Sequence, residues 1–295
     1  MLQEQRIAFQ NVDKRIQEMT MLYKKVAFKF VKAGDIDNKS IGSILETKEA
    51  SSPSSARRSY LTNLQEGNNR TVEFSEWPNI TDIAVTTDNK VFFCNFIMIV
   101  NFGKIYVYKL NQDNLAYNTA FSLPREPYGI SILTGTDKAV ITLPYASYVQ
   151  CINTKYLKLD KTIEVGKGCY GITTSEYFVA VGKTDEIRIL KQNGEIIKTI
   201  VLSDRVFCNV CSLLYNLHDG SIIYRKSGQV RGIQLDGTVL YQYKVSRGSG
   251  LVVDAQGNVY VSEENKSEIQ GLLPYGRFVD VVLTGEDDIA IRYNV

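Results

Sequence analysis

Few residues in this sequence have the type and spacing that catalysis or metal binding requires. His218 is the only histidine and lies in the turn-like segment NLHDGS, so a Ser-His-Asp triad would need a distant serine. Cys208 and Cys211 form a CxxC pair, but zinc usually requires a second pair or added histidines, and a redox role would need a thioredoxin-like context. We therefore expect no metal site and no cofactor, and we interpret His218 as an exposed turn residue and the cysteine pair as structural core.

One enzymatic alternative stays open at Asp254 and Asn258. They lie in GLVVDAQGNVYVS, residues 250–262, which resembles the repeat of sugar-lactone hydrolases of the gluconolactonase type. Those hydrolases are β-propellers, and the resemblance implies a divalent metal held in their central channel by Glu, Asn and Asp ligands. However, Asp254 leads directly into a predicted hairpin turn, where Asp is favoured for hydrogen bonds to its own backbone.

A set of basic and aromatic residues is the strongest candidate for a ligand-binding site. The basic residues recur at nearly regular intervals, and most of them share a short segment with an aromatic residue. The cations are Arg125, Lys167, Arg205 and Arg247, and the aromatic residues are Trp77, Tyr128, Tyr170 and Phe207. Cations interleaved with aromatic rings suit an acidic peptide, a phosphorylated motif or single-stranded RNA. The alternative is that these are ordinary polar loops whose aromatic residues wedge between elements of the core.

The elements that would position this set form an internal repeat. The repeat openings are Asp82, Gly129, Gly171 and Gly250, and CSLLYNLHDG (211–220) lies in the middle of the longest interval. Apolar, β-branched strands alternate with turn signals such as Asp88-Asn89, Asp219-Gly220, Asn193-Gly194 and Asp236-Gly237, which supply the positive φ of tight hairpins. Four short strands in each repeat predict an all-β fold, a β-propeller of four-stranded blades.

The blade count and the chain ends are less regular. Five units fill residues 80–284, and the segments 71–77 and 289–293 could form half of a sixth blade, so we expect five blades or an incomplete six. Before them, apolar residues from Phe9 to Phe30 follow the 3, 4 rhythm of a heptad, which predicts a coiled-coil helix over 1–33 that forms a homodimer. A single amphipathic helix packed on a neighbouring domain is the alternative. The division is then helix 1–33, linker 34–76 and propeller 77–295.

Composition indicates an intracellular protein. Lys and Arg exceed Asp and Glu by only two among 295 residues, so bulk charge points to neither nucleic acid nor a membrane surface. Five cysteines without a framework spacing suggest reduced thiols, and the N-terminus has no signal peptide. No apolar run approaches the length of a membrane span, so we expect a cytoplasmic protein.

The run Phe96 to Val100, followed by Phe102, is interpreted as core, with an exposed contact patch as the alternative.

The repeats resemble a known family. The segments ITDIAVTTDNKVFFCN, PYGISILTGTDKAVITLP and GLVVDAQGNVYVSEENKSEIQGLLPYGR are similar to the C-terminal NHL-like propeller of invertebrate tripartite-motif (TRIM) and B-box proteins, over residues 80–289. The resemblance implies a partner-selecting propeller beside a RING and B-box module with ubiquitin-ligase activity. This sequence departs from it in having no RING or B-box, a nearly absent sixth blade and the apolar segment FIMIVNF.

These observations predict a non-enzymatic binding module. The propeller would recognise a protein partner or ubiquitination target, with RNA as the second ligand class. The alternative is a metal-dependent, lactonase-like hydrolase, which would bind a divalent metal tightly.

Overall fold

The fold is known from a computed structural model of the 295-residue chain. The structure describes residues 27–31, 40–45, 70–74, 79–96, 103–110, 115–202, 208–246, 250–254 and 256–284. Within these ranges the protein is built from β-strands, with one short 3-10 helix, η2 (Glu264–Lys266). The predicted all-β class is confirmed.

Five four-stranded antiparallel sheets follow one another along the chain, each with its strands in sequence order. Blade 1 consists of β4 (Ile80–Val85), β5 (Lys90–Asn95), β6 (Gly103–Leu110) and β7 (Leu115–Leu123). Blade 2 consists of β8 (Ile130–Leu133), β9 (Lys138–Thr142), β10 (Tyr148–Asn153) and β11 (Lys158–Glu164). Blade 3 consists of β12 (Ile172–Thr174), β13 (Val179–Gly182), β14 (Glu186–Leu190) and β15 (Ile196–Val201).

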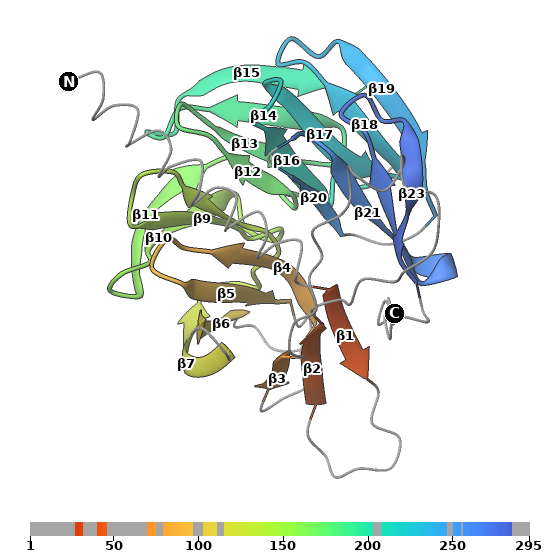
Figure 1. The fold of residues 1–295 in the computed structure, drawn as a ribbon. Helices are drawn as coiled ribbons and strands as arrows, with labels where there is room; N and C mark the ends of the chain where they lie inside the picture. The colour runs from red at the N-terminus through yellow and green to blue at the C-terminus, as the bar shows by residue number, and fades with distance from the viewer. Residues whose placement is uncertain are drawn as a thin grey trace, which may run out of the picture.

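The last two blades have the same plan. Blade 4 consists of β16 (Ser212–Asn216), β17 (Ser221–Lys226), β18 (Gln229–Ile233) and β19 (Val239–Lys244). Blade 5 consists of β20 (Leu251–Val253), β21 (Val259–Glu263), β22 (Glu268–Leu272) and β23 (Phe278–Leu283). Together these sheets form the predicted propeller, with five complete blades arranged as a fan (Figure 1).

The first strand of each blade is the innermost. In succession β4, β8, β12, β16 and β20 pack beside one another, whereas β20 and β4 do not pack comparably among the described strands. Hydrogen bonds join neighbouring inner strands: the Ile130 amide donates to Asp82 Oδ2 at 2.8 Å, and Thr174 Oγ1 donates to the Ile132 carbonyl at 2.6 Å. The blades therefore make an arc held together along its inner edge.

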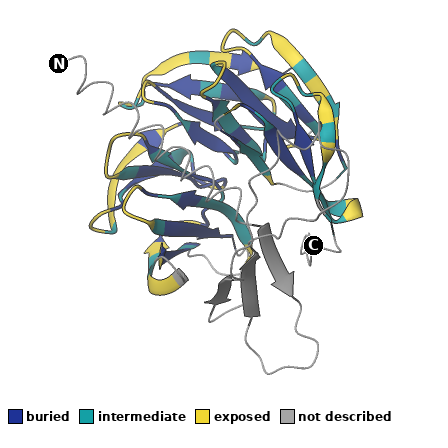
Figure 2. Cartoon of the chain, in the orientation of Figure 1, coloured by how far each residue is buried: buried dark blue, intermediate teal, exposed yellow. Residues whose placement is uncertain are grey.

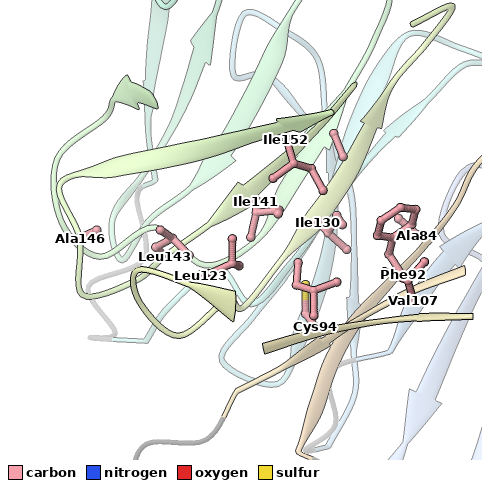
Figure 3. Packing of buried hydrophobic residues seen from close by; sticks show 12 residues of the cluster. Ala84, Phe92, Cys94, Val107, Leu123, Ile130, Ile141, Leu143, Ala146 and Ile152 are labelled. Atoms are coloured by element: carbon pink, nitrogen blue, oxygen red, sulfur yellow. The ribbon is translucent and has the colours of Figure 1, made fainter. Parts of the chain in front are cut away.

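Alternation within the strands explains the packing between blades. Because successive side chains of a strand point to opposite faces, an apolar strand in the middle of a blade can contribute to two cores. Phe92 and Cys94 of β5 pack with Ile130 and Ile141 of blade 2, whereas Phe93 belongs to a separate cluster (Figure 3). Further clusters join blades 2 and 3, 3 and 4, and 4 and 5, so buried residues concentrate in the middle strands of the blades (Figure 2).

The hairpin signals of the sequence coincide with the observed turns. Positive φ occurs at Asn89 and at glycines in the connections between the first and second and between the third and fourth strands. These glycines are Gly135, Gly194, Gly220, Gly237, Gly257 and Gly276. His218 lies exposed in the turn after β16, as predicted.

The segments before the propeller differ from the sequence-based expectation. Residues 27–31 form β1 (Ala27–Val31), and β2 (Ser40–Leu45) and β3 (Arg70–Phe74) lie within the predicted linker. These strands pair in the order β1-β2-β3, which is consistent with the aromatic and β-branched residues of AFKFV, SIGSIL and RTVEF. Strand β3 agrees with the strand expected within residues 71–77. Strands β1 and β2 lie in the segments assigned to the helix and the linker, and that division of the chain stays a prediction. Residues 1–26, 97–102 and 285–295 lie outside the described residues, so the coiled coil and the last strand of a sixth blade stay predictions.

The described part of the chain contains no helix of the length and apolar character that a membrane crossing requires.

Candidate protein-binding surface

The antiparallel topology sends alternate connections of each blade to opposite ends. We call one end the loop face, which carries the connections between second and third strands and those from one blade to the next. The other end, here called the turn face, carries the tight hairpins after the first and third strands. The two predicted cations that the structure describes, Arg125 and Lys167, lie in segments between blades and thus belong to the loop face.

Four aromatic rings meet on the loop face, and we call them the aromatic row. Tyr128 and Tyr170, in the segments leading into β8 and β12, contact edge to face with centroids 5.1 Å apart. Phe96, directly after β5, contacts Tyr128 edge to face at 5.4 Å and stacks on Tyr145 at 6.1 Å. Such offset and T-shaped geometries are the favourable ones for aromatic pairs. The row thus links blades 1, 2 and 3.

Burial differs along the aromatic row. Phe96 is buried and Tyr128 and Tyr170 are half-buried, whereas Tyr145 is 49% exposed. Loss of hydration, followed by the proximity of Tyr145 and Cys211, raises the pKa of the Tyr170 hydroxyl. The inner members are therefore wedged between blades and present an uncharged ring and hydroxyl, and Tyr145 offers most of the accessible ring area.

Polar groups of the segment that leads into β16 contact the inner tyrosines. The Asn209 side chain hydrogen-bonds to Tyr170 and accepts a bond from Thr184 Oγ1 at 2.9 Å. Burial raises the pKa of the Cys211 thiol, and a hydrogen bond with the Tyr128 side chain opposes that shift. These bonds fix the ring positions, which reduces the entropy that a ligand would lose on binding.

Four of the eight predicted site residues lie among the described residues. Arg125 and Lys167 are exposed in the segments that carry Tyr128 and Tyr170. The backbone of the Arg125 segment approaches Gly103 so closely that a Cβ there would collide with the Arg125 carbonyl oxygen. Trp77, Arg205, Phe207 and Arg247 lie outside the described residues. Tyr128 and Tyr170 are brought into contact, and ligand binding by any of the eight stays a prediction.

Sequence reasoning missed two members of the aromatic row. Tyr145 lies in the connection between β9 and β10, and Phe96 begins the apolar run that the sequence marked as core or contact patch. Both follow the second strand of a blade, and this shared position was the available signal. Their contact joins segments that are far apart in the sequence and depends on how blades 1 and 2 pack, which the repeat pattern alone does not describe.

A buried arginine supports the same face farther along the arc. Arg225 of β17 is 4% exposed, and its guanidinium donates to the carbonyl oxygens of Ser262 at 2.8 Å and Ser246 at 3.1 Å. Because Arg225 belongs to blade 4 and both acceptors to blade 5 and the segment leading into it, this side chain joins the two blades.

The carboxylate of Asp254 is hydrogen-bonded by residues in and directly after its own turn. Its Oδ1 accepts bonds from the amides of Gln256 and Asn258, and its Oδ2 accepts bonds from Asn258 Nδ2 and the Tyr260 hydroxyl, all between 2.9 and 3.0 Å. This is the backbone-bonding turn role that the sequence suggested. Among the described residues, no group of three or more His, Cys, Asp or Glu side chains is arranged to hold a metal ion.

The five cysteines differ in burial. Cys94, Cys151 and Cys169 are buried, whereas Cys208 is exposed and Cys211 half-buried. The expectation that the CxxC pair belongs to the core is therefore wrong for Cys208, because the segment before β16 lies on the loop face and not within a strand.

Comparisons with known proteins support the architecture. No family model and no curated protein matches the chain. A solved structure described as a nidogen/laminin complex matches with a TM-score of 0.57 and 10% identity, covering 74% of this chain and 85% of that one. A functionally unknown protein from Desulfotomaculum acetoxidans matches with a TM-score of 0.58 and 13% identity, covering 83% and 78%. Hydrazine synthase from Kuenenia stuttgartiensis matches with a TM-score of 0.50 and 14% identity, covering 66% and 63%.

These similarities concern the fold. At such identities they establish a β-propeller, which agrees with the blade count and topology described above. The narrower similarity to tripartite-motif propellers has no matching family model behind it.

Proposed function

We propose that this propeller is a non-enzymatic protein-binding module that captures an acidic peptide segment of its partner on the loop face. The observation that carries the proposal is the aromatic row, a preformed surface ending in the accessible ring of Tyr145. Rigid aromatic side chains flanked by cations are typical anchors of protein interfaces. Arg125 and Lys167, both exposed on the same face, supply charge that complements Asp, Glu or phosphorylated side chains.

Other observations agree with this role. One solved propeller of similar fold was determined in a complex of nidogen and laminin. The side-chain bonds of Asp254 within its turn give no support to the lactonase alternative. In a tripartite-motif-like setting, the propeller would select a target for ubiquitination, acting in the cytoplasm, and the predicted coiled coil over 1–33 would pair two copies to increase avidity.

The test uses peptides selected on the protein itself. A random phage-displayed peptide library would be panned against the immobilised full chain, and selected peptides would be measured by fluorescence anisotropy. We expect peptides rich in Asp and Glu, and a loss of about 30-fold in affinity for Tyr145→Ala, the effect of removing an interface anchor worth about 2 kcal/mol. Lys167→Glu should weaken binding and reduce its dependence on salt.

The matched control is Tyr177→Ala, since Tyr177 is 76% exposed but lies on the turn face. Equal losses for Tyr145→Ala and Tyr177→Ala would contradict binding at the aromatic row. Tight binding of labelled oligouridine with a steep salt dependence, in the absence of peptide binding, would instead indicate an RNA-binding propeller.

A further inference from the structure

The outermost strand of blade 3, β15, has an exposed apolar edge. Ile196, Ile197 and Val201 are 49%, 52% and 77% exposed, and the other exposed position of the strand is Thr199. Five of its six residues are β-branched, the type that most favours strand pairing. An edge strand also presents unpaired backbone N–H and C=O groups, so β15 combines an open hydrogen-bonding edge with an uncovered apolar surface.

The other outermost strands carry exposed charges or pack beside another strand. Charges occupy exposed positions of β11 (Lys158, Asp160, Lys161 and Glu164), of β19 (Lys244) and of β23 (Asp280). Exposed charges on an edge are the usual device that prevents strand addition. The edge strand β7 exposes one large apolar residue, Tyr117, and packs beside β3. Among the described outermost strands, only β15 exposes three aliphatic side chains and no fully exposed charge.

We propose that β15 pairs with β15 of a second copy of this chain, antiparallel about a two-fold axis at Thr199. A two-fold axis perpendicular to the joined sheets keeps the same face of each strand on the same side. Residues 197, 199 and 201, all exposed on one face of β15, then align with their counterparts. Ile197 lies opposite Val201 of the second copy, and Thr199 lies opposite itself.

This register is self-complementary. Apolar residues oppose each other, and Thr–Thr pairs are favourable across antiparallel strands. The one charge, Lys198, lies opposite Ile200 and not opposite its own copy, so no like charges meet. Because the free edge of β15 in each copy is paired with the other, the assembly closes as a dimer and does not grow into a fibre. The two copies of blade 3 then form one continuous sheet.

Asp236 lies beside this region and favours the arrangement. It is in the turn before β19, where hydrogen bonds from Thr238 lower the pKa of its carboxyl group and electrostatic attraction to Lys198 adds to this effect. Glu186, the cross-strand neighbour of Val201, is already paired with Lys183 and Arg188. Glu186 therefore presents no unpaired charge to a second apolar strand.

Sedimentation velocity would test this in the full chain carrying Ile16→Asp, which removes any contribution of the predicted coiled coil. We expect a dimer at about 100 µM, since a strand-pairing interface is small and its affinity weak. Val201→Lys should shift the protein to a monomer. The matched control Leu159→Lys, at a residue 49% exposed on β11, should leave the dimer intact. A monomer before the Val201 change, or a dimer after it, would overturn the proposal.

Crosslinking gives a second test that does not depend on Val201→Lys folding. In a Cys208→Ser background, Thr199→Cys should form a covalent dimer with oxidised glutathione, because directly opposed strand residues lie within disulfide reach. Thr162→Cys, the same exposed residue type on β11, should remain monomeric on a non-reducing gel. Equal crosslinking of both variants, or of neither, would contradict pairing at Thr199.

Discussion

Replacement of Arg225 by methionine should loosen blade 5 specifically. Methionine keeps much of the length and the apolar stem of the side chain but removes the donors that reach the Ser262 and Ser246 carbonyl oxygens at 2.8 and 3.1 Å. Each bond from a charged donor is worth about 1.5 kcal/mol at the lower end of its range, so the loss is about 3 kcal/mol. For a domain of this size that corresponds to a fall in Tm of about 6–12 °C.

The location of the effect follows from the open arc. Among the described strands, β20 packs beside β16 but not comparably beside β4, so blade 5 depends mainly on blade 4. In repeat architectures, loss of one interface weakens the unit beyond it. We therefore expect faster amide hydrogen exchange in β20 to β23 and unchanged exchange in β8 to β11.

Urea denaturation and hydrogen-exchange mass spectrometry would measure the two effects. Arg225→Lys should lie between wild type and Arg225→Met, because one ammonium group cannot span the acceptors that the guanidinium reaches. The control Arg277→Met, at an exposed turn residue, should change the free energy of unfolding by less than about 0.5 kcal/mol. A stability of Arg225→Met within that margin, or a loss of protection spread evenly over all blades, would refute the reasoning.

Three further predictions follow from burial and close contacts. Burial, opposed by hydrogen bonds from the Ile130 and Ile83 amides, raises the pKa of Asp82 to about 7. Because the folded state then holds the Asp82 proton more tightly than the unfolded state, the free energy of unfolding should fall as the pH rises from about 4 to about 7. Urea titrations of Asp82→Asn should lack this decline. Gly103→Ala should lower the free energy of unfolding by more than about 2 kcal/mol, because the new Cβ would meet the Arg125 carbonyl. Gly135→Ala, whose Cβ meets nothing within 4 Å, should lower it by about 1 kcal/mol because of the positive φ. Equal changes in Tm for the two variants would contradict this. Iodoacetamide should modify Cys208 in the native protein well before Cys94, Cys151 and Cys169, and mass spectrometry showing equal rates would contradict the assigned burial.

The repeat period and the turn residues determined most of the architecture from the sequence. Strand propensity and positive-φ turns are local properties, and their regular recurrence along the chain has few solutions other than a propeller. For this reason the five blades and the hairpin turns coincide with the structure. The strands formed by AFKFV and SIGSIL were not predicted, although their aromatic and β-branched residues favour strands.

Only the tertiary structure decided which side chains meet and which stay exposed. Tyr128 and Tyr170 were identifiable from their repeat positions, but the contact of Phe96 with Tyr145 requires two blades at a fixed spacing. In the sequence, nothing distinguishes Arg225 from other strand residues; the structure shows its buried guanidinium between two blades. The exposed edge of β15 likewise depends on which strand is outermost. Contacts between distant segments arise from the packing of blades around an axis, and a one-dimensional pattern does not contain that geometry.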